Sequence, residues 1–148
     1  MKARWQSVPT NLRHKLERFN LPQDTYWLLL EVLISQHSNM LGVFRCPNAY
    51  LMADLSWKIE RVDENLNRLI EIQLVYNDPE KSLLMIDPTL EMNPIEDYRN
   101  APTVNCALKV LHFLPPSKIY EPLVVRLKSL NRPLIDPIIK KLQKLSRE

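Results

Sequence analysis

PNAYLMADLSWKIERVDENLNRLIEIQLVYNDPEKSLLMI, the segment formed by residues 47–86, decides the fold. Its first half holds two amphipathic helical patterns, residues 47–55 and 57–72, with a short turn between them. Its second half holds two β-prone runs, residues 74–76 and 82–86, joined by the turn-forming letters NDPEK. Two helices joined by a short turn are typical of a helix-turn-helix, and a hairpin directly after them is a wing. The segment therefore predicts a winged helix-turn-helix.

The spacing of apolar residues predicts which side of each helix is buried. Pro47 opens the first helix, and we expect Tyr50, Leu51 and Leu55 to point inward. In the second helix the apolar positions recur every three or four residues, which is the period of one helix face. We expect this helix to bury Ile59, Val62, Leu66, Leu69 and Ile70.

A helix and a short strand are predicted before this segment. Asn20 is expected to cap the helix, with Gln23 completing a capping box and Pro22 in the first turn. The strand is expected at residues 43–46, a β-prone run that lies between Gly42 and Pro47. The buried stripe of the helix is expected to consist of Tyr26, Leu29, Leu30, Leu33 and Ile34.

The rest of the chain is predicted to form a linker and a helical extension. Pro88, Pro94 and Pro102 interrupt residues 88–102, which show no periodicity. Helical patterns follow at residues 103–114, 118–130 and 136–146. The fold class is therefore mainly α with a small β-wing, that is, a winged helix-turn-helix followed by a C-terminal helical extension. The expected divisions are a basic arm at residues 1–19, a winged-helix domain at 20–87, a linker at 88–102 and the extension at 103–148.

The composition excludes several kinds of chemistry. The chain of 148 residues has one glycine, Gly42, so a glycine-rich phosphate-binding loop is excluded. Cys46 and Cys106 are far apart in the sequence, and we expect two buried free thiols rather than a metal site. No apolar run is long enough to cross a membrane, and no signal-peptide pattern is present. We therefore expect a cytoplasmic protein that is not an enzyme, has no cofactor and does not enter a membrane.

Charge is distributed unevenly along a chain whose net charge is +3. Residues 1–20 carry a net charge of +4 and residues 102–148 carry +6, whereas residues 21–57 carry −2 and residues 58–101 carry −5. Basic segments are typical of contacts to the phosphates of nucleic acids. Both ends of the chain are therefore candidates for such contacts, whereas the acidic middle is not.

Several runs of residues resemble one family. The run SNMLGVFRCP at residues 38–47 is similar to the turn and first strand of phage replisome-organiser proteins, which are winged-helix replication initiation proteins related to the DnaD-like primosome proteins. DLSW at 54–57, followed by Arg61 and Val62, looks like that family's entry into the recognition helix. MNPI at 92–95, then Asn105 and LPPS at 114–117 look like its pattern beyond the wing.

The resemblance covers about residues 20–130 and implies a DNA-binding or replisome-scaffolding domain of a phage or prophage. Lys58 stands where the family often has a Ser or Thr cap, so Ser56 is expected to cap the recognition helix instead. The implied partners are DNA and a replication protein.

The second helix of the segment is the candidate DNA-reading element, because such a helix enters the major groove with its outward side chains. The candidate residues on this helix and on the wing are Lys58, Arg61, Glu64, Asn65, Arg68 and Lys81. Candidate contacts to the DNA backbone from the two ends of the chain are Arg4, Arg13, Lys15, Arg18, Lys140, Lys141 and Lys144. Because the helix also carries several carboxylates, an ordinary solvated face remains an alternative.

Two functional hypotheses follow. The first is a DNA-binding winged helix that acts in phage or prophage replication initiation or in regulation. The second is an adaptor without enzymatic activity that uses the same fold to bind a replication partner or to form a homo-oligomer through its C-terminal helices. The acidic middle of the chain and the amphipathic last helix favour the second hypothesis.

Overall fold

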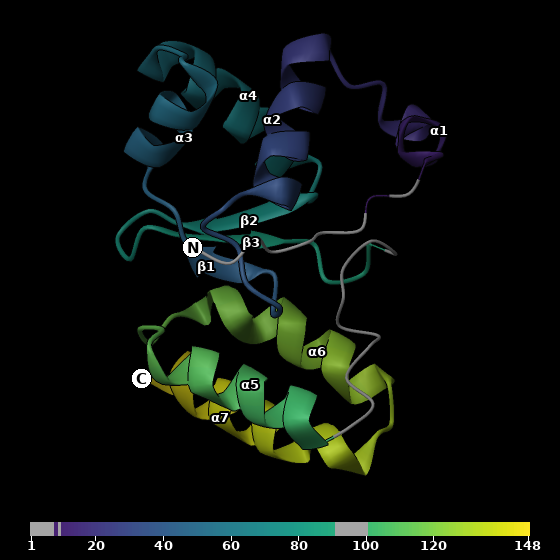
Figure 1. The fold of residues 1–148 in the computed structure, drawn as a ribbon, viewed down its shortest axis with the longest axis vertical. Helices are drawn as coiled ribbons and strands as arrows, with labels where there is room; N and C mark the ends of the chain where they lie inside the picture. Colours follow the sequence, from purple (N-terminus) through teal and green to yellow (C-terminus); the bar gives the residue numbers. More distant parts are fainter. Residues whose placement is uncertain (1–7, 9, 91–100) are drawn as a thin grey trace.

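A small antiparallel sheet lies between two layers of helices in the computed structural model, which describes residue 8, residues 10–90 and residues 101–148 (Figure 1). The sheet is formed by β1 (Val43–Arg45), β2 (Val75–Asp78) and β3 (Leu83–Ile86). The N-terminal layer contains α1 (Leu12–Lys15), the 3-10 turn η1 (Glu17–Phe19), α2 (Gln23–Ile34), α3 (Asn48–Leu55) and α4 (Ile59–Glu71). The C-terminal layer contains α5 (Ala101–His112), η3 (Lys118–Tyr120), α6 (Glu121–Ser129), η4 (Pro133–Ile135) and α7 (Asp136–Arg147).

The strand order is β1-β3-β2, so that β3 pairs with a strand on each side. Val43 lies opposite Met85 in the first pair, and Tyr76 lies opposite Met85 in the second. The predicted short strand and the predicted hairpin are both confirmed. The mainly helical fold with a small β element is confirmed as well.

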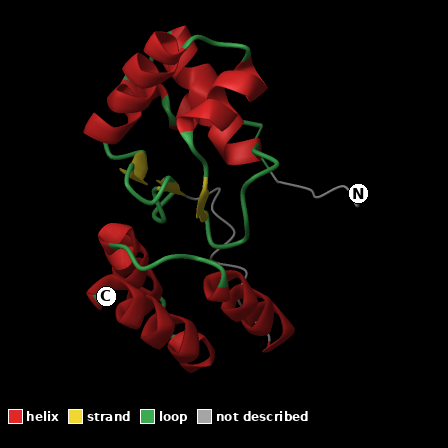
Figure 2. Cartoon of the chain, turned by 90° about the vertical axis from the view of Figure 1, so that its left-hand side faces the viewer, coloured by secondary structure: helices red, strands yellow, loops and turns green. Residues whose placement is uncertain are grey.

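All four residues of β3 are buried because both faces of the sheet are covered. Successive side chains of a strand point to opposite faces. Leu83 and Met85 therefore belong to the core of the C-terminal layer, whereas Leu84 and Ile86 belong to the core of the N-terminal layer. Figure 2 shows the strands between the two groups of helices from a second direction. The hairpin consequently lies in the middle of the molecule, between the two layers of helices.

The C-terminal layer is part of the same packed body as the sheet. Its three predicted helices are confirmed, although α5 begins at Ala101, inside the predicted linker. Its core contains Leu41 and Val43 from the β1 region. The Ser117 hydroxyl also donates a hydrogen bond to the Asp78 carboxylate at the end of β2. The expectation of an extension appended beyond a linker is therefore wrong for these helices, which cover one face of the sheet.

The predicted linker lies partly outside the described residues, since residues 91–100 are not among them. This gap includes the MNPI run of the family resemblance. At the start of the predicted linker, Pro88 is buried and Leu90 packs against the core of the N-terminal layer. Pro88 and Leu90 are therefore packed against the N-terminal layer, whereas Thr89 between them is exposed.

The predicted basic arm is part of the N-terminal core from residue 10 onward. Helix α1 begins at Leu12, within the predicted arm. Leu12 and Leu16 are both buried in the core of the N-terminal layer. The expectation of an arm is therefore wrong for residues 10–19, and Arg4 lies outside the described residues.

The helix starts differ from the predictions at two places. Asn20 has a left-handed backbone at the end of η1, and α2 begins at Gln23 without a side-chain cap. Ser56 also has a left-handed backbone, at the end of α3, and α4 has no side-chain cap. Both predicted caps are therefore wrong, because these residues close the preceding helix instead of starting the next one.

The buried stripe of α2 lies about one residue away from its predicted position. Leu29 and Leu33 are buried as predicted, whereas Ile34 is exposed. The prediction from spacing considered only apolar residues, and it therefore did not include Thr25, whose hydroxyl is buried. The buried residues of α2 are Thr25, Leu28, Leu29, Val32 and Leu33.

Candidate nucleic-acid interface

Helix α4 lies across the N-terminal layer with one face in the core. Val62, Leu66 and Leu69 are buried, as the sequence predicted. Leu51 is the buried residue of α3, whereas Tyr50 is exposed. The face of α4 away from this core carries the candidates Arg61, Glu64 and Arg68, whose contacts decide whether they are available to a ligand.

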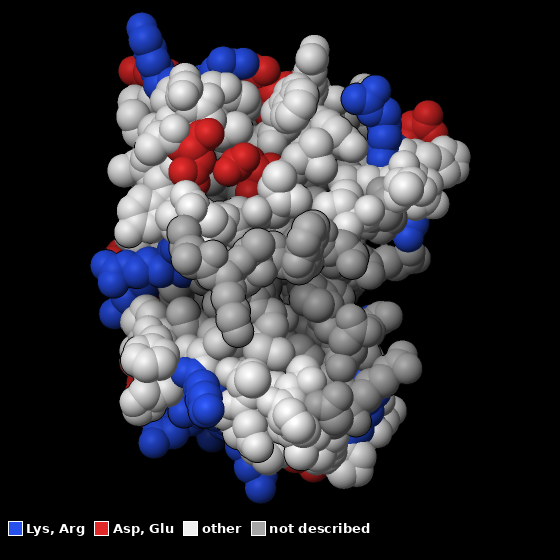
Figure 3. All heavy atoms as spheres, in the orientation of Figure 1, with Lys and Arg blue, Asp and Glu red and all other residues white. Residues whose placement is uncertain are grey.

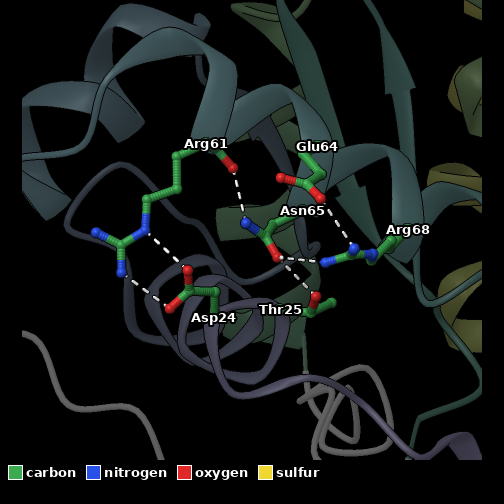
Figure 4. Close-up of polar contacts among 6 residues, drawn as sticks. All are labelled: Asp24, Thr25, Arg61, Glu64, Asn65 and Arg68. Carbon is green, nitrogen blue, oxygen red and sulfur yellow. Dashed lines mark hydrogen bonds and ion pairs between the residues drawn. The ribbon is translucent and has the colours of Figure 1, made fainter.

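Arg61 is occupied by a neighbour from another helix. Its Nε and Nη2 atoms donate to the two carboxylate oxygens of Asp24 on α2, at 2.8 and 2.9 Å (Figure 4). The guanidinium also lies 4.1 Å from the centre of the Trp57 ring. The hydrogen bond from Arg61 lowers the pKa of Asp24 below its usual range. Asp24 thus engages two of the five N–H donors of Arg61 and neutralises its charge, which weakens the attraction of this side chain for a guanine or a phosphate.

Asn65 is not on the outer face, so its predicted role in base reading is wrong. The residue is 1% exposed. Its Oδ1 accepts a hydrogen bond of 2.7 Å from the Thr25 hydroxyl, and its Nδ2 donates to the backbone oxygen of Arg61 (Figure 4). A buried amide needs such partners, since an unpaired polar group in a core is costly. Asn65 therefore joins α4 to α2.

Arg68 and Glu64 neutralise each other on the outer face of α4. The Nη2 atom of Arg68 lies 2.9 Å from Oε1 of Glu64, one helical turn away (Figure 4). The Nη1 atom of the same guanidinium donates to Asn65 at 3.4 Å. Glu64 is exposed, and its carboxylate would repel a phosphate. Both arginines of α4 are thus held by carboxylates of the protein.

The other two candidates lie at the ends of neighbouring elements. Lys58 is exposed directly before α4. Lys81 is exposed in the β2–β3 turn, where its backbone N–H donates to the carboxylate of Asp78. Both lysines therefore lie outside α4 itself, Lys58 before its first residue and Lys81 in the hairpin turn.

The two layers have opposite net charge. Residues 10–90 contain eight Lys or Arg and eleven Asp or Glu, a net charge of −3, whereas residues 101–148 contain nine and three, a net charge of +6. On one face of the molecule, Figure 3 shows both acidic and basic groups on the upper layer and mainly basic groups on the lower layer. The strongest attraction for an anion therefore comes from the C-terminal layer.

The outer face of α7 brings three cations into one row. Lys140, Lys144 and Arg147 are exposed and stand at i, i+4 and i+7, so they share one side of the helix. Ile138, Ile139 and Leu142 on the opposite side are buried. Lys141 is half-buried at the edge of the row. No ion pair between described residues occupies the row.

The cations near the N-terminus lie against aromatic rings. The Arg13 guanidinium lies 5.4 Å from the centre of the Tyr26 ring, and that of Arg18 lies 4.6 Å from the centre of the Phe19 ring. Lys15 is half-buried. These residues belong to the N-terminal layer, on the side of the sheet opposite to α7.

The structure also shows the surroundings of the two cysteines and tests for a metal site and for a membrane-spanning helix. Cys46 is buried as expected, and burial followed by the charges of Asp54 and Glu31 raises its pKa to about 12, whereas Cys106 is exposed, contrary to expectation. Within the described ranges, no group of three or more His, Cys, Asp or Glu residues is placed to hold a metal ion. No helix among these residues combines the length and apolarity needed to cross a membrane.

Comparison of the chain with protein-family models, with curated proteins and with solved structures found no match. The assignment of function therefore depends on the arrangement of its own residues.

Sequence reasoning missed the residues that occupy the arginines of α4. Asp24 is 37 positions from Arg61, and Thr25 is 40 positions from Asn65. No local spacing links residues so far apart. The one available signal was the acidic content of α4 itself, which already indicated a weak match to DNA.

Proposed function

We propose that the chain is a DNA-binding protein without enzymatic activity, of winged-helix architecture, which holds the DNA backbone through the basic row on α7. The observation that carries the proposal is the row itself, Lys140, Lys144 and Arg147. At a rise of 1.5 Å per residue its ends are separated by about 10.5 Å along the axis. This is roughly three base-pair steps along the axis of a DNA duplex, at 3.4 Å each.

The winged-helix part of the proposal is supported by the order of elements. Helix α2, strand β1, helices α3 and α4 and the β2–β3 hairpin follow one another, and β1 pairs with β3. The resemblance of residues 38–47 and 54–57 to phage replisome-organiser proteins supports a role in replication initiation or regulation. The ion pairs of Arg61 and Arg68 argue for contacts to phosphates by α7 rather than base reading by α4.

The test is fluorescence anisotropy of a labelled mixed-sequence duplex at several salt concentrations. Replacing Lys140, Lys144 and Arg147 together by Gln should weaken binding at least about tenfold and reduce the salt slope by about two to three, because each phosphate contact contributes about 0.9 to it. The matched control is Arg61→Gln with Arg68→Gln, which should change affinity less than about threefold, since both side chains are already paired.

Two results would contradict the proposal. One is no binding of the unmodified chain at tens of micromolar and low salt, a concentration range in which non-specific DNA binding is normally seen. The other is a loss of binding in the α4 control variant with none in the α7 variant, which would place the interface on α4.

An adaptor is the second candidate function, and the paired arginines of α4 favour it. A face whose charges are already satisfied suits contact with another protein better than contact with phosphate. Arg61→Glu with Arg68→Glu separates the two functions. It should leave DNA binding through α7 largely intact and weaken a partner that docks on α4. Pull-down with a candidate replication protein and anisotropy with DNA measure the two outcomes.

A further inference from the structure

Three large apolar side chains are exposed on helices α2 and α3 of the N-terminal layer. Trp27 and Ile34 on α2 are 53% and 55% exposed, and Tyr50 on α3 is exposed as well. Trp27, Glu31 and Ile34 stand at i, i+4 and i+7 and so share one side of α2. Asp54 on α3 lies beside them. These five residues are called the α2–α3 face below, and large apolar side chains exposed on neighbouring helices are typical of interaction surfaces.

The contacts between α2 and α3 hold this face together. His37, directly after α2, lies with its ring centre 4.4 Å from that of Tyr50 and its Nε2 3.2 Å from the Asp54 carboxylate. Burial, followed by the charge of Asp54, raises the pKa of Glu31. Among the described residues no ion pair reaches Glu31. A cation brought by a partner would relieve the repulsion between these two carboxylates.

At the end of helix α5, in the C-terminal layer, the surface is apolar and basic rather than apolar and acidic. Phe113, directly after the helix, is 83% exposed and lies edge-on to His112. Lys109, one turn earlier on the same side, is exposed too. Helix α5 contains no Asp or Glu. An exposed aromatic ring next to a lysine is the apolar and basic counterpart of the α2–α3 face.

We propose that copies of this chain associate head to tail, with Phe113 and Lys109 of one copy docking on the α2–α3 face of the next. Phe113 packs against Trp27, Ile34 and Tyr50, and Lys109 lies against Glu31 and Asp54. The net charges of +6 and −3 on the two layers bring the copies together in this orientation. Each copy keeps one surface of each kind, so the contact can repeat. This inference does not depend on DNA binding by α7.

The test is sedimentation velocity of the full chain over a range of concentrations. The unmodified chain should associate, and added salt should weaken the association because the contact joins opposite charges. Phe113→Ser should weaken association at least about tenfold, as removal of a central aromatic anchor does. Glu31→Lys with Asp54→Lys should do the same from the other surface. Phe113 is 83% exposed, whereas Glu31 is half-buried and the side chain of Asp54 is 19% exposed, so circular dichroism is needed to check that each variant is folded.

A mixture of the two variants gives the most specific test of the head-to-tail contact. Each of these two variants keeps the surface that the other has lost, so an equimolar mixture should form a dimer containing one copy of each, while each alone stays a monomer. The matched control is Val125→Ser, which changes a side chain that is 68% exposed on α6 and should leave association unchanged. The Lys140, Lys144 and Arg147 variant lowers the charge of the C-terminal layer from +6 to +3, so it should weaken association less than Phe113→Ser does while it loses DNA binding, which separates this proposal from the DNA-binding one.

Three outcomes would overturn the proposal. The first is an unmodified chain that remains a monomer at hundreds of micromolar in low salt. The second is a mixture of the two variants that stays monomeric. The third is a Val125→Ser variant that loses association while Phe113→Ser keeps it, because the contact would then lie on α6.

Discussion

The two helical layers form their cores from the same strand and yet present opposite surfaces. The N-terminal layer packs on Leu84 and Ile86 and carries a net charge of −3, whereas the C-terminal layer packs on Leu83 and Met85 and carries +6. The alternation along β3 accounts for the packing of both layers. The charges are set by exposed residues that the packing does not restrict. The two layers therefore depend on each other for stability, but their surfaces are free to differ in function.

Removal of the C-terminal layer should have the largest effect on the stability of the fold. A chain that ends at Leu90 would expose Leu41, Val43, Leu83 and Met85, which are all nearly inaccessible in the full chain. We expect it to lose its cooperative thermal transition, because one face of a three-stranded sheet would be left uncovered. Circular dichroism on heating and dispersion of the amide NMR signals measure this. A chain ending at Leu90 that unfolds as sharply as the full chain would show that the N-terminal layer is an independent domain.

Truncation of one buried side chain on each face of β3 has the next largest effect. Leu84→Ala and Met85→Ala remove core groups of the N-terminal and the C-terminal layer, respectively. Each should lower the free energy of unfolding by about 2–5 kcal/mol. Urea unfolding followed by fluorescence and by circular dichroism measures both variants. If either variant showed two separate transitions, the layers would not unfold as one unit.

The polar contact between α2 and α4 should contribute less. Thr25→Val keeps the shape of the side chain but removes the hydroxyl that donates to Asn65 in the core. We expect a loss of about 1–3 kcal/mol, since a buried acceptor of Asn65 is left with a weaker partner. Thr25→Ser, which keeps the hydroxyl, is the control and should cost less. Equal losses in the two variants would show that the methyl group, and not the hydrogen bond, matters at this position.

Local pattern was sufficient to predict most helices and strands of this chain. The period of α4 correctly predicted the burial of Val62, Leu66 and Leu69, and turn residues correctly predicted the hairpin. The sequence also contains a signal for the burial of both faces of the sheet, which the prediction of a wing does not use. Residues 83–86 are four consecutive apolar residues, and such a run indicates a strand covered on both faces, whereas a wing exposed on one face should alternate.

The candidate site was less predictable because its contacts join distant parts of the chain. Whether Arg61 is available depends on Asp24, and whether Asn65 is exposed depends on the hydroxyl of Thr25. Both partners lie on α2, which meets α4 only after folding. By contrast, the row on α7 is visible in the sequence because it lies within one helix, where residues four apart share a face.

The smallest expected effect concerns the carboxylates of the α2–α3 face. Burial and then the charge of Asp54 raise the pKa of Glu31 above its usual 4.5, while His37 opposes this. The ionised form is therefore disfavoured in the folded chain, so Glu31→Gln should stabilise the fold at pH 7, by less than about 1 kcal/mol for a partly exposed group. The gain should disappear as the pH falls below 4.5, where Glu31 is protonated in both states.

Urea unfolding at pH 7 and at pH 4 measures the difference, and Glu71→Gln on the exposed side of α4 is the control. A loss of stability at pH 7 would mean that Glu31 is held by an attractive partner, and the α2–α3 face would then offer one carboxylate fewer to an incoming lysine.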